Sequence, residues 1–174
     1  MKNIVATLSL LFATTLSAQV AIGKATVSSP AVSLEFYDNA DNTRGIILPW
    51  VTSTAAVTGA VNGTLVYNTA DRKVYVKYAS GWRDLSVDNT GTVTTTLQDS
   101  LTDQDTAKVL IGGDPATDTT PGILVLADTN KAMVLPKVAS PHLNIVNPSP
   151  GMMVYDTTKK QLAVFNGTVW SFWK

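Results

Sequence analysis

The feature that most constrains the fold of this chain is a short unit that occurs twice. Each occurrence begins with glycine, contains an apolar run that ends in Tyr-Asn-Thr or Tyr-Asp-Thr, continues with a second apolar run and closes on a tryptophan. The first occurrence spans residues 63–82 and the second spans residues 151–170, so corresponding positions differ by 88. Because self-similarity at a fixed spacing is the signature of repeated structural units, the sequence predicts two tandem copies of one small module.

Each unit is predicted to form a β-hairpin. Residues 65–76 contain two apolar runs separated by a polar turn, and residues 153–164 repeat the arrangement. The turn starts at Asn68 in the first copy and at Asp156 in the second, and both residue types bond to the nearby backbone in turns. Aliphatic residues alternate along each returning strand and should face the interior. These residues are Val74, Val76, Leu162 and Val164.

Short apolar runs before each hairpin predict further strands. They cover residues 19–23, 32–36 and 45–51 in the first copy, and residues 108–112, 123–127 and 132–138 in the second. In the run 32–36 the apolar residues alternate with polar ones, which is typical of a strand with one buried face. The run 123–127 is apolar at every position, which predicts a strand that is covered on both faces or that lies deep in its module.

The composition agrees with an all-β fold. The chain has 174 residues, with 13 basic side chains, 13 acidic side chains and no cysteine. Glutamate occurs once, whereas threonine, valine, asparagine and glycine are common, so strand and turn formers outnumber helix formers. The balanced charge favours neither nucleic acid nor an anionic membrane surface as a partner. Because no disulfide can stabilise two such small modules, we expect the copies to pack on each other or several chains to assemble.

The predicted organisation is a signal peptide (residues 1–18), a first β module (19–85), a polar connector (86–106) and a second β module (107–174). At the N-terminus, Lys2 precedes an apolar run that is too short to span a bilayer, and small residues precede Gln19. This pattern is typical of a secretory signal cleaved after Ala18, rather than of an amphipathic helix that stays attached. No second apolar run is long enough to anchor the chain in a membrane.

The sequence contains little that catalysis or metal binding requires. His142 is the single histidine and lies in a predicted loop, and the chain lacks the motifs of common hydrolases, nucleotide-binding proteins and zinc enzymes. Residues 38–42 hold several oxygen ligands but lack the alternating spacing and the distal glutamate of a calcium loop, so they predict a polar turn. We therefore expect no enzymatic activity, no cofactor and no metal site.

Aromatic side chains are the main candidates for ligand binding. Four of them recur at equivalent positions and are predicted to fill the cores of their modules: Trp82, Trp170, Tyr67 and Tyr155. Trp50 and Trp173 have no aromatic counterpart in the other copy, where Lys137 and Leu85 stand. If aromatic side chains bind a ligand, Trp50 and Trp173 are the candidates for stacking on a sugar ring. A carbohydrate-binding module is therefore the alternative function.

The order of these motifs resembles that of short modules in secreted surface proteins of Bacteroidota, and it is similar to that of phage tail-fibre-like modules. The matching segments are residues 20–23, 45–49, 63–69 and 81–82 in the first copy and residues 109–112, 135–136, 151–157 and 166–170 in the second. The second copy departs from the pattern at Ala132, where the family usually has glycine.

The resemblance implies an exported, non-enzymatic protein with a structural or adhesive role. Such a protein presents β modules to a protein or glycan partner, and it can do so within a fibre or oligomer. The resemblance further implies self-association or binding to other surface proteins. It places the chain at the cell surface or in the periplasm of a Gram-negative bacterium.

Overall fold

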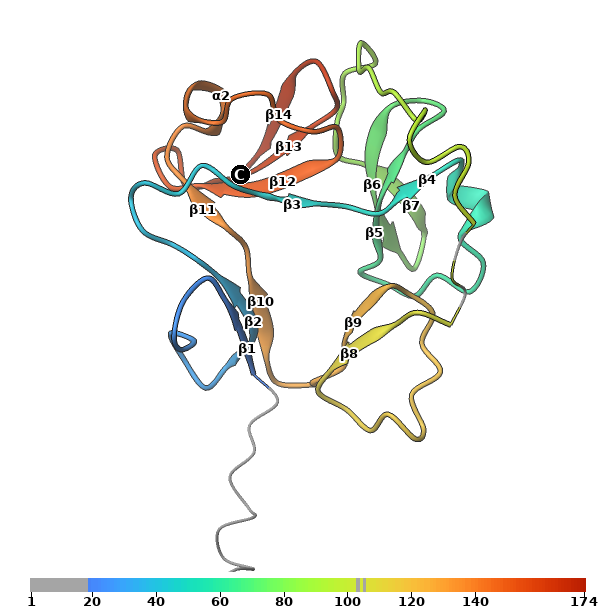
Figure 1. Cartoon of the computed structure of the whole chain (residues 1–174), viewed down its shortest axis with the longest axis vertical. Coiled ribbons are helices and arrows are strands. Elements are labelled where there is room, and N and C mark those ends of the chain that lie inside the picture. Colours follow the sequence, from blue (N-terminus) through green and yellow to red (C-terminus); the bar gives the residue numbers. More distant parts are fainter. Residues whose placement is uncertain (1–18, 103, 105) are drawn as a thin grey trace, which may run out of the picture.

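The computed structural model describes residues 19–102, 104 and 106–174, and its regular structure is almost entirely β-strand (Figure 1). The predicted signal peptide, residues 1–18, lies outside the described residues. Besides strands, the described part of the chain contains a 3-10 turn, η2 (Thr54–Ala56), and one helical turn, α2 (Pro141–Asn144). The all-β fold class predicted from the sequence is confirmed.

The strands are short and are distributed over both halves of the chain. Those before residue 86 are β1 (Val20–Ile22), β2 (Val32–Phe36), β3 (Ile46–Ile47), β4 (Trp50–Val51), β5 (Leu65–Asn68), β6 (Lys73–Tyr78) and β7 (Gly81–Asp84). Those after residue 106 are β8 (Val109–Ile111), β9 (Leu124–Leu126), β10 (Ala132–Val134), β11 (Lys137–Val138), β12 (Met152–Asp156), β13 (Gln161–Phe165) and β14 (Trp170–Trp173). The sheets formed by the described residues are β1-β2-β10, β4-β5-β6-β7, β8-β9, and β11-β12-β13-β14 with β3 beside β12.

Both hairpins form, and their strands pair in equivalent registers. Tyr67 lies opposite Val74 in the first hairpin, and Tyr155 lies opposite Leu162 in the second. The side-chain oxygen of Asn68 accepts the backbone N–H two residues later at 3.0 Å, and the carboxylate of Asp156 does the same at 2.9 Å. The turn chemistry of the repeated unit therefore produces the same local structure in both halves.

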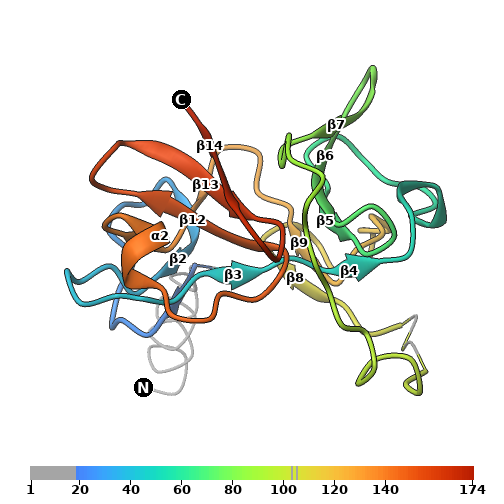
Figure 2. The same cartoon turned by 90° about the horizontal axis from the view of Figure 1, so that it is seen from above.

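The two halves exchange strands. β10, from the second half, pairs in parallel with β2 of the first, and β3, from the first half, pairs antiparallel with β12 of the second. Figure 2 shows β3 beside the sheet of β12 to β14, with β4 following it toward β5 to β7. The first half thus contributes a strand to the main sheet of the second half.

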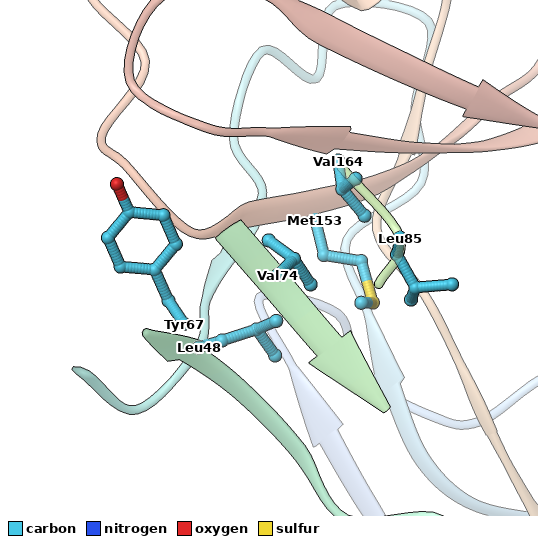
Figure 3. Close-up of a cluster of buried hydrophobic side chains, with 6 residues drawn as sticks. All are labelled: Leu48, Tyr67, Val74, Leu85, Met153 and Val164. Atoms are coloured by element: carbon cyan, nitrogen blue, oxygen red, sulfur yellow. The ribbon is translucent and has the colours of Figure 1, made fainter. Parts of the chain in front are cut away.

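One buried cluster of apolar side chains draws on both halves. Its members are Leu48, Tyr67, Val74 and Leu85 from the first half and Met153 and Val164 from the second (Figure 3). A second cluster, which includes Val154 and Phe165, lies within the second half. The expectation that each module fills its own core is therefore wrong for the first module. Its hairpin is too small to enclose a core alone, and strands β12 and β13 complete the burial.

β8 and β9 form a parallel pair that corresponds to β1 and β2 in the first half. Leu124 lies opposite Val109, as Leu34 lies opposite Val20. Within the described residues, β9 pairs with β8 alone. Ile123 and Leu124 are 64% and 46% exposed. The sequence predicts that the run 123–127 is covered on both faces or lies deep in its module. In the single chain this prediction is wrong for Ile123 and Leu124, whose side chains face water.

The start of the connector is held against the turn between β13 and β14. The amide of Asn166 donates to the carboxylate of Asp88 at 3.2 Å, and the Thr92 hydroxyl donates to the Gly167 carbonyl at 2.9 Å. Gly91 is buried between these contacts, and a Cβ on it would lie 2.5 Å from the Asn166 carbonyl oxygen. The described part of the connector contains no strand or helix, but its first residues join the two halves.

The shared core leads to a prediction about cooperativity. Met153→Ala should lower the free energy of unfolding by about 2–5 kcal/mol, because it leaves a cavity in the cluster that both hairpins build. Urea denaturation followed by tryptophan fluorescence and by circular dichroism should give one coincident transition in the wild type and in the variant. As a control, Val146→Ala alters a side chain that is 82% exposed, and its effect should stay below about 0.5 kcal/mol. Two separate transitions in the wild type would contradict a shared core.

Candidate functional site

The side chains with catalytic or metal-binding potential are scattered. Among the described residues, no three His, Cys, Asp or Glu side chains gather in a group that could hold a metal ion. His142 is exposed on α2, with its ring edge-to-face against Phe172 at 5.8 Å between centroids. Within residues 19–102, 104 and 106–174, no helix has the length and apolar character needed to cross a bilayer.

Trp50 and Trp173, the two predicted ligand-stacking residues, both lie at the contact between the halves. Each is half-buried and packs against the cluster shared by the halves. The Trp50 indole N–H donates to the Pro150 carbonyl at 3.0 Å, so it reaches from the first half to the second. The Trp173 indole N–H donates to the Leu85 carbonyl at 2.5 Å and reaches the opposite way. This reciprocal arrangement favours a structural role for both rings over a flat platform for sugar.

The signal for this role was present in the sequence. Neither tryptophan has an aromatic counterpart at the equivalent position of the other copy. When two similar halves meet through different surfaces, the residues that form the contact differ between the two copies of the sequence. Nonrecurring aromatic residues could have been assigned to the contact between the copies on this ground.

The four recurring aromatics lie in unlike surroundings. Tyr67 is fully buried, and its hydroxyl donates to the Asn166 carbonyl at 2.8 Å. Burial raises the pKa of Tyr67 to about 12. Trp170 packs against the second cluster, with its ring 5.3 Å from that of Phe165.

Trp82 and Tyr155 do not share these positions. Both are half-buried and belong to neither cluster, and Trp82 lies opposite Lys77 where Trp170 lies opposite Phe165. The prediction that Trp82 fills the core of its module, as Trp170 does, is therefore wrong. An apolar neighbour across the strand pair is present in one half only.

Ion pairs connect the turn at residues 38–42 to both halves. Lys24 contacts the carboxylates of Glu35 at 2.9 Å and Asp38 at 3.1 Å, and Lys137 from the second half contacts Asp38 at 3.2 Å. The amide of Asn42 donates to the Lys137 carbonyl at 3.1 Å. The oxygen-rich turn thus bonds to lysines and backbone groups, in agreement with its interpretation as a polar turn.

Glu35 is the buried member of this network. Burial by itself raises the pKa of Glu35, but the Lys24 ammonium and the Ser28 N–H, 2.5 Å from the carboxylate, outweigh burial and hold the pKa below its usual range. The Lys24 and Lys137 ammonium groups likewise lower the pKa of Asp38. Both carboxylates are therefore held in the charged form.

Exposed apolar side chains remain on strands at the edges of two sheets. They are Ile47 on β3 (53% exposed), Val109 on β8 (57%), and Ile123 and Leu124 at β9 (64% and 46%). A shallow apolar depression next to β3 is lined in part by Ile47, Leu48 and Trp50. Exposed apolar side chains on an unpaired strand edge suit association with another β-structure. Sequence reasoning found these strands but not their exposure, because exposure depends on which distant strand pairs with them.

Comparison with known proteins gives a match that includes Ile123 and Leu124 but not Ile47 or Val109. Residues 114–173 match the family model described as phage tail like trimerisation region. The match covers about a third of the chain and runs from the approach to β9 into β14. It supports the likeness to phage tail-fibre-like modules. Neither the curated proteins nor the solved structures give a match to this chain.

The lowered pKa of Glu35 leads to a prediction about acid stability. A carboxylate whose pKa is lower in the folded than in the unfolded state stabilises the fold above its unfolded pKa of about 4.3, and this contribution is lost as the pH falls through the folded pKa. Wild-type Tm should therefore fall between about pH 5 and pH 3, and Glu35→Gln should flatten this fall. Asp99→Asn, at an exposed position, is the matched control and should keep the wild-type slope. Parallel Tm curves for wild type and Glu35→Gln would refute the role of Glu35.

Proposed function

We propose that this protein is an exported, non-enzymatic structural protein that assembles through its β-sheets into a trimer, as a building element of a fibre-like or surface-attached structure. The observation that carries the proposal is the match of residues 114–173 to a trimerisation region. That region contains Ile123 and Leu124, at the start of β9, whose side chains are exposed in the single chain. A structural role also agrees with the half-burial of Trp50 and Trp173.

The internal construction of the chain supports association by strand pairing. Its two halves are already joined by pairs that cross between them, β2 with β10 and β3 with β12. A fold that joins its own halves in this manner can join copies of itself through the same kind of contact. The absence of cysteine means that such an assembly depends on packing and hydrogen bonding.

The mass in solution tests the proposal directly. The chain starting at Gln19 should sediment at three times its own mass at micromolar concentrations, because a stable interface holds at concentrations above its Kd. Sedimentation equilibrium over a hundredfold range of concentration measures this. A monomer throughout the range would refute the proposed function.

Export forms a second part of the proposal. Gln19 follows the small residues Ser17 and Ala18, and its side chain donates to the backbone carbonyls of Ser29, Pro30 and Val32 at 3.2, 3.1 and 2.8 Å. The residue that cleavage would leave at the N-terminus is thus tied to β2. The proposed compartment is the periplasm or cell surface of a Gram-negative bacterium, by the resemblance to secreted Bacteroidota proteins.

Expression of the full chain in a Gram-negative host should yield mature protein that begins at Gln19, because signal peptidase cuts after small residues. Intact-mass spectrometry of the periplasmic fraction measures the N-terminus. Ala18→Arg should block cleavage at this site, while Thr15→Ser, which keeps a small polar residue, should not. Full-length protein that stays in the cytoplasm would contradict the assignment.

A further inference from the structure

β2 and β9 are equivalent strands with unequal neighbours. Both pair in parallel with the strand that precedes them, through Leu34 opposite Val20 and Leu124 opposite Val109. On its other edge, β2 has β10, and Met133 lies opposite Leu34. In the described part of the chain, the other edge of β9 has no strand.

The missing neighbour changes the exposure of equivalent side chains. Leu34 is 1% exposed, whereas Leu124, its counterpart, is 46% exposed. Ser33, which precedes Leu34, is 1% exposed, whereas Ile123, which precedes Leu124, is 64% exposed. The open strand thus carries the more apolar residues, although they face water in the single chain. Such exposure is unfavourable and, on a strand edge, indicates a surface that another chain covers.

The backbone of β9 is oriented for a second neighbour. The Val109 N–H donates to the Ile123 carbonyl, and the Ala127 N–H donates to the Ile111 carbonyl, both across the β8 side. Because backbone polar groups alternate between the two edges of a strand, those of Leu124 and Leu126 point to the open edge. These N–H and C=O groups are available to form hydrogen bonds with a further strand.

The strand that fits this edge is identified by the repeat. The counterpart of β10 in the first half is β3, since positions 133 and 46 correspond at the spacing of 87 seen for the proline that follows each strand. β3 uses one edge for β12, where the Leu48 N–H donates to the Gly151 carbonyl. By the same alternation, the N–H and C=O of Ile47 point to the opposite edge, and the Ile47 side chain is 53% exposed. β3 and β9 of one chain do not pair with each other.

We propose that β9 of one copy pairs in parallel with β3 of a second copy, with Leu124 opposite Ile46 and Val125 opposite Ile47. In this register, Ile46 and Ile47 take the places opposite β9 that Met133 and Val134 of β10 take opposite β2. The inference rests on the proposed function and names its interface. Each copy contributes β9 to one contact and β3 to another, so the contact is head to tail. In a closed ring of three copies, every β9 edge and every β3 edge is paired.

The proposal is confined to this one strand pair. In the β3–β12 contact, a Cβ on Gly45 would lie 2.6 Å from the Val154 side chain and 2.9 Å from the Met153 carbonyl oxygen. Ala132 occupies the counterpart of Gly45 in the second half. If β10 packed equally closely on β5 of another copy, the Cβ of Ala132 would therefore clash with that strand. In the first half, Gly45 has no Cβ and avoids this clash.

Disulfide trapping tests the register. The chain has no cysteine, so Leu124→Cys combined with Ile46→Cys introduces one pair. Adjacent strands lie about 4.8 Å apart, within the range that a disulfide can bridge. Oxidised protein should run as covalent dimers and trimers on non-reducing gels and return to monomers with reductant. Each single variant, and the control pair Val146→Cys with Ile46→Cys, should remain monomeric on the gel. Dimers from Leu124→Cys alone would show pairing of β9 with itself and would overturn the proposal.

A second variant separates this inference from the proposed function. Leu124→Lys should weaken trimer formation at least about tenfold in Kd, because a charge would enter an apolar contact. Since Leu124 is exposed in the single chain, the circular dichroism spectrum should be unchanged, and Val146→Lys should assemble like the wild type. A Leu124→Lys protein that trimerises normally overturns the β9–β3 contact and leaves the trimer in place. A wild-type protein that is monomeric overturns both.

Discussion

The exchange of strands between the two halves is the constraint on which the rest of the structure depends. β3 belongs to the first half in sequence and to the second half in its pairing, while β10 does the reverse. Through these pairs the hairpin of the first half meets Met153 and Val164 and gains a closed core. Without a disulfide, the small hairpin of the first half does not close this core alone. The core of the first half is therefore completed by strands of the second half.

Polar contacts define how the halves meet. The indole N–H groups of Trp50 and Trp173 each find a carbonyl in the opposite half, and Asp38 joins Lys24 to Lys137. Such contacts contribute modestly to stability, but they disfavour alternative registers because a misplaced half-buried donor or carboxylate would lose its partner. The apolar cluster thus favours association of the halves, and the polar contacts select one geometry.

Local features of the fold could be predicted from the sequence, and long-range features could not. The hairpins follow from alternating aliphatics and from the turn chemistry of Asn68 and Asp156, which act within a few residues. The pairing of β2 with β10 joins segments separated by about a hundred residues, and no local pattern encodes it. For the same reason the sequence indicated the apolar character of residues 123–127 but not their exposure. The different environments of Trp82 and Trp170 likewise arise from cross-strand neighbours outside the conserved spacing of the unit.

The late position of β12 and β13 in the chain has a consequence for the order of folding. The sheet of β4 to β7 is complete at residue 84, yet Val74 cannot be enclosed until Met153 and Val164 have been synthesised. A nascent chain of this kind stays open through most of its production, and contacts between such distant segments form slowly. A polypeptide that cannot close early matures only once its last strands have been synthesised.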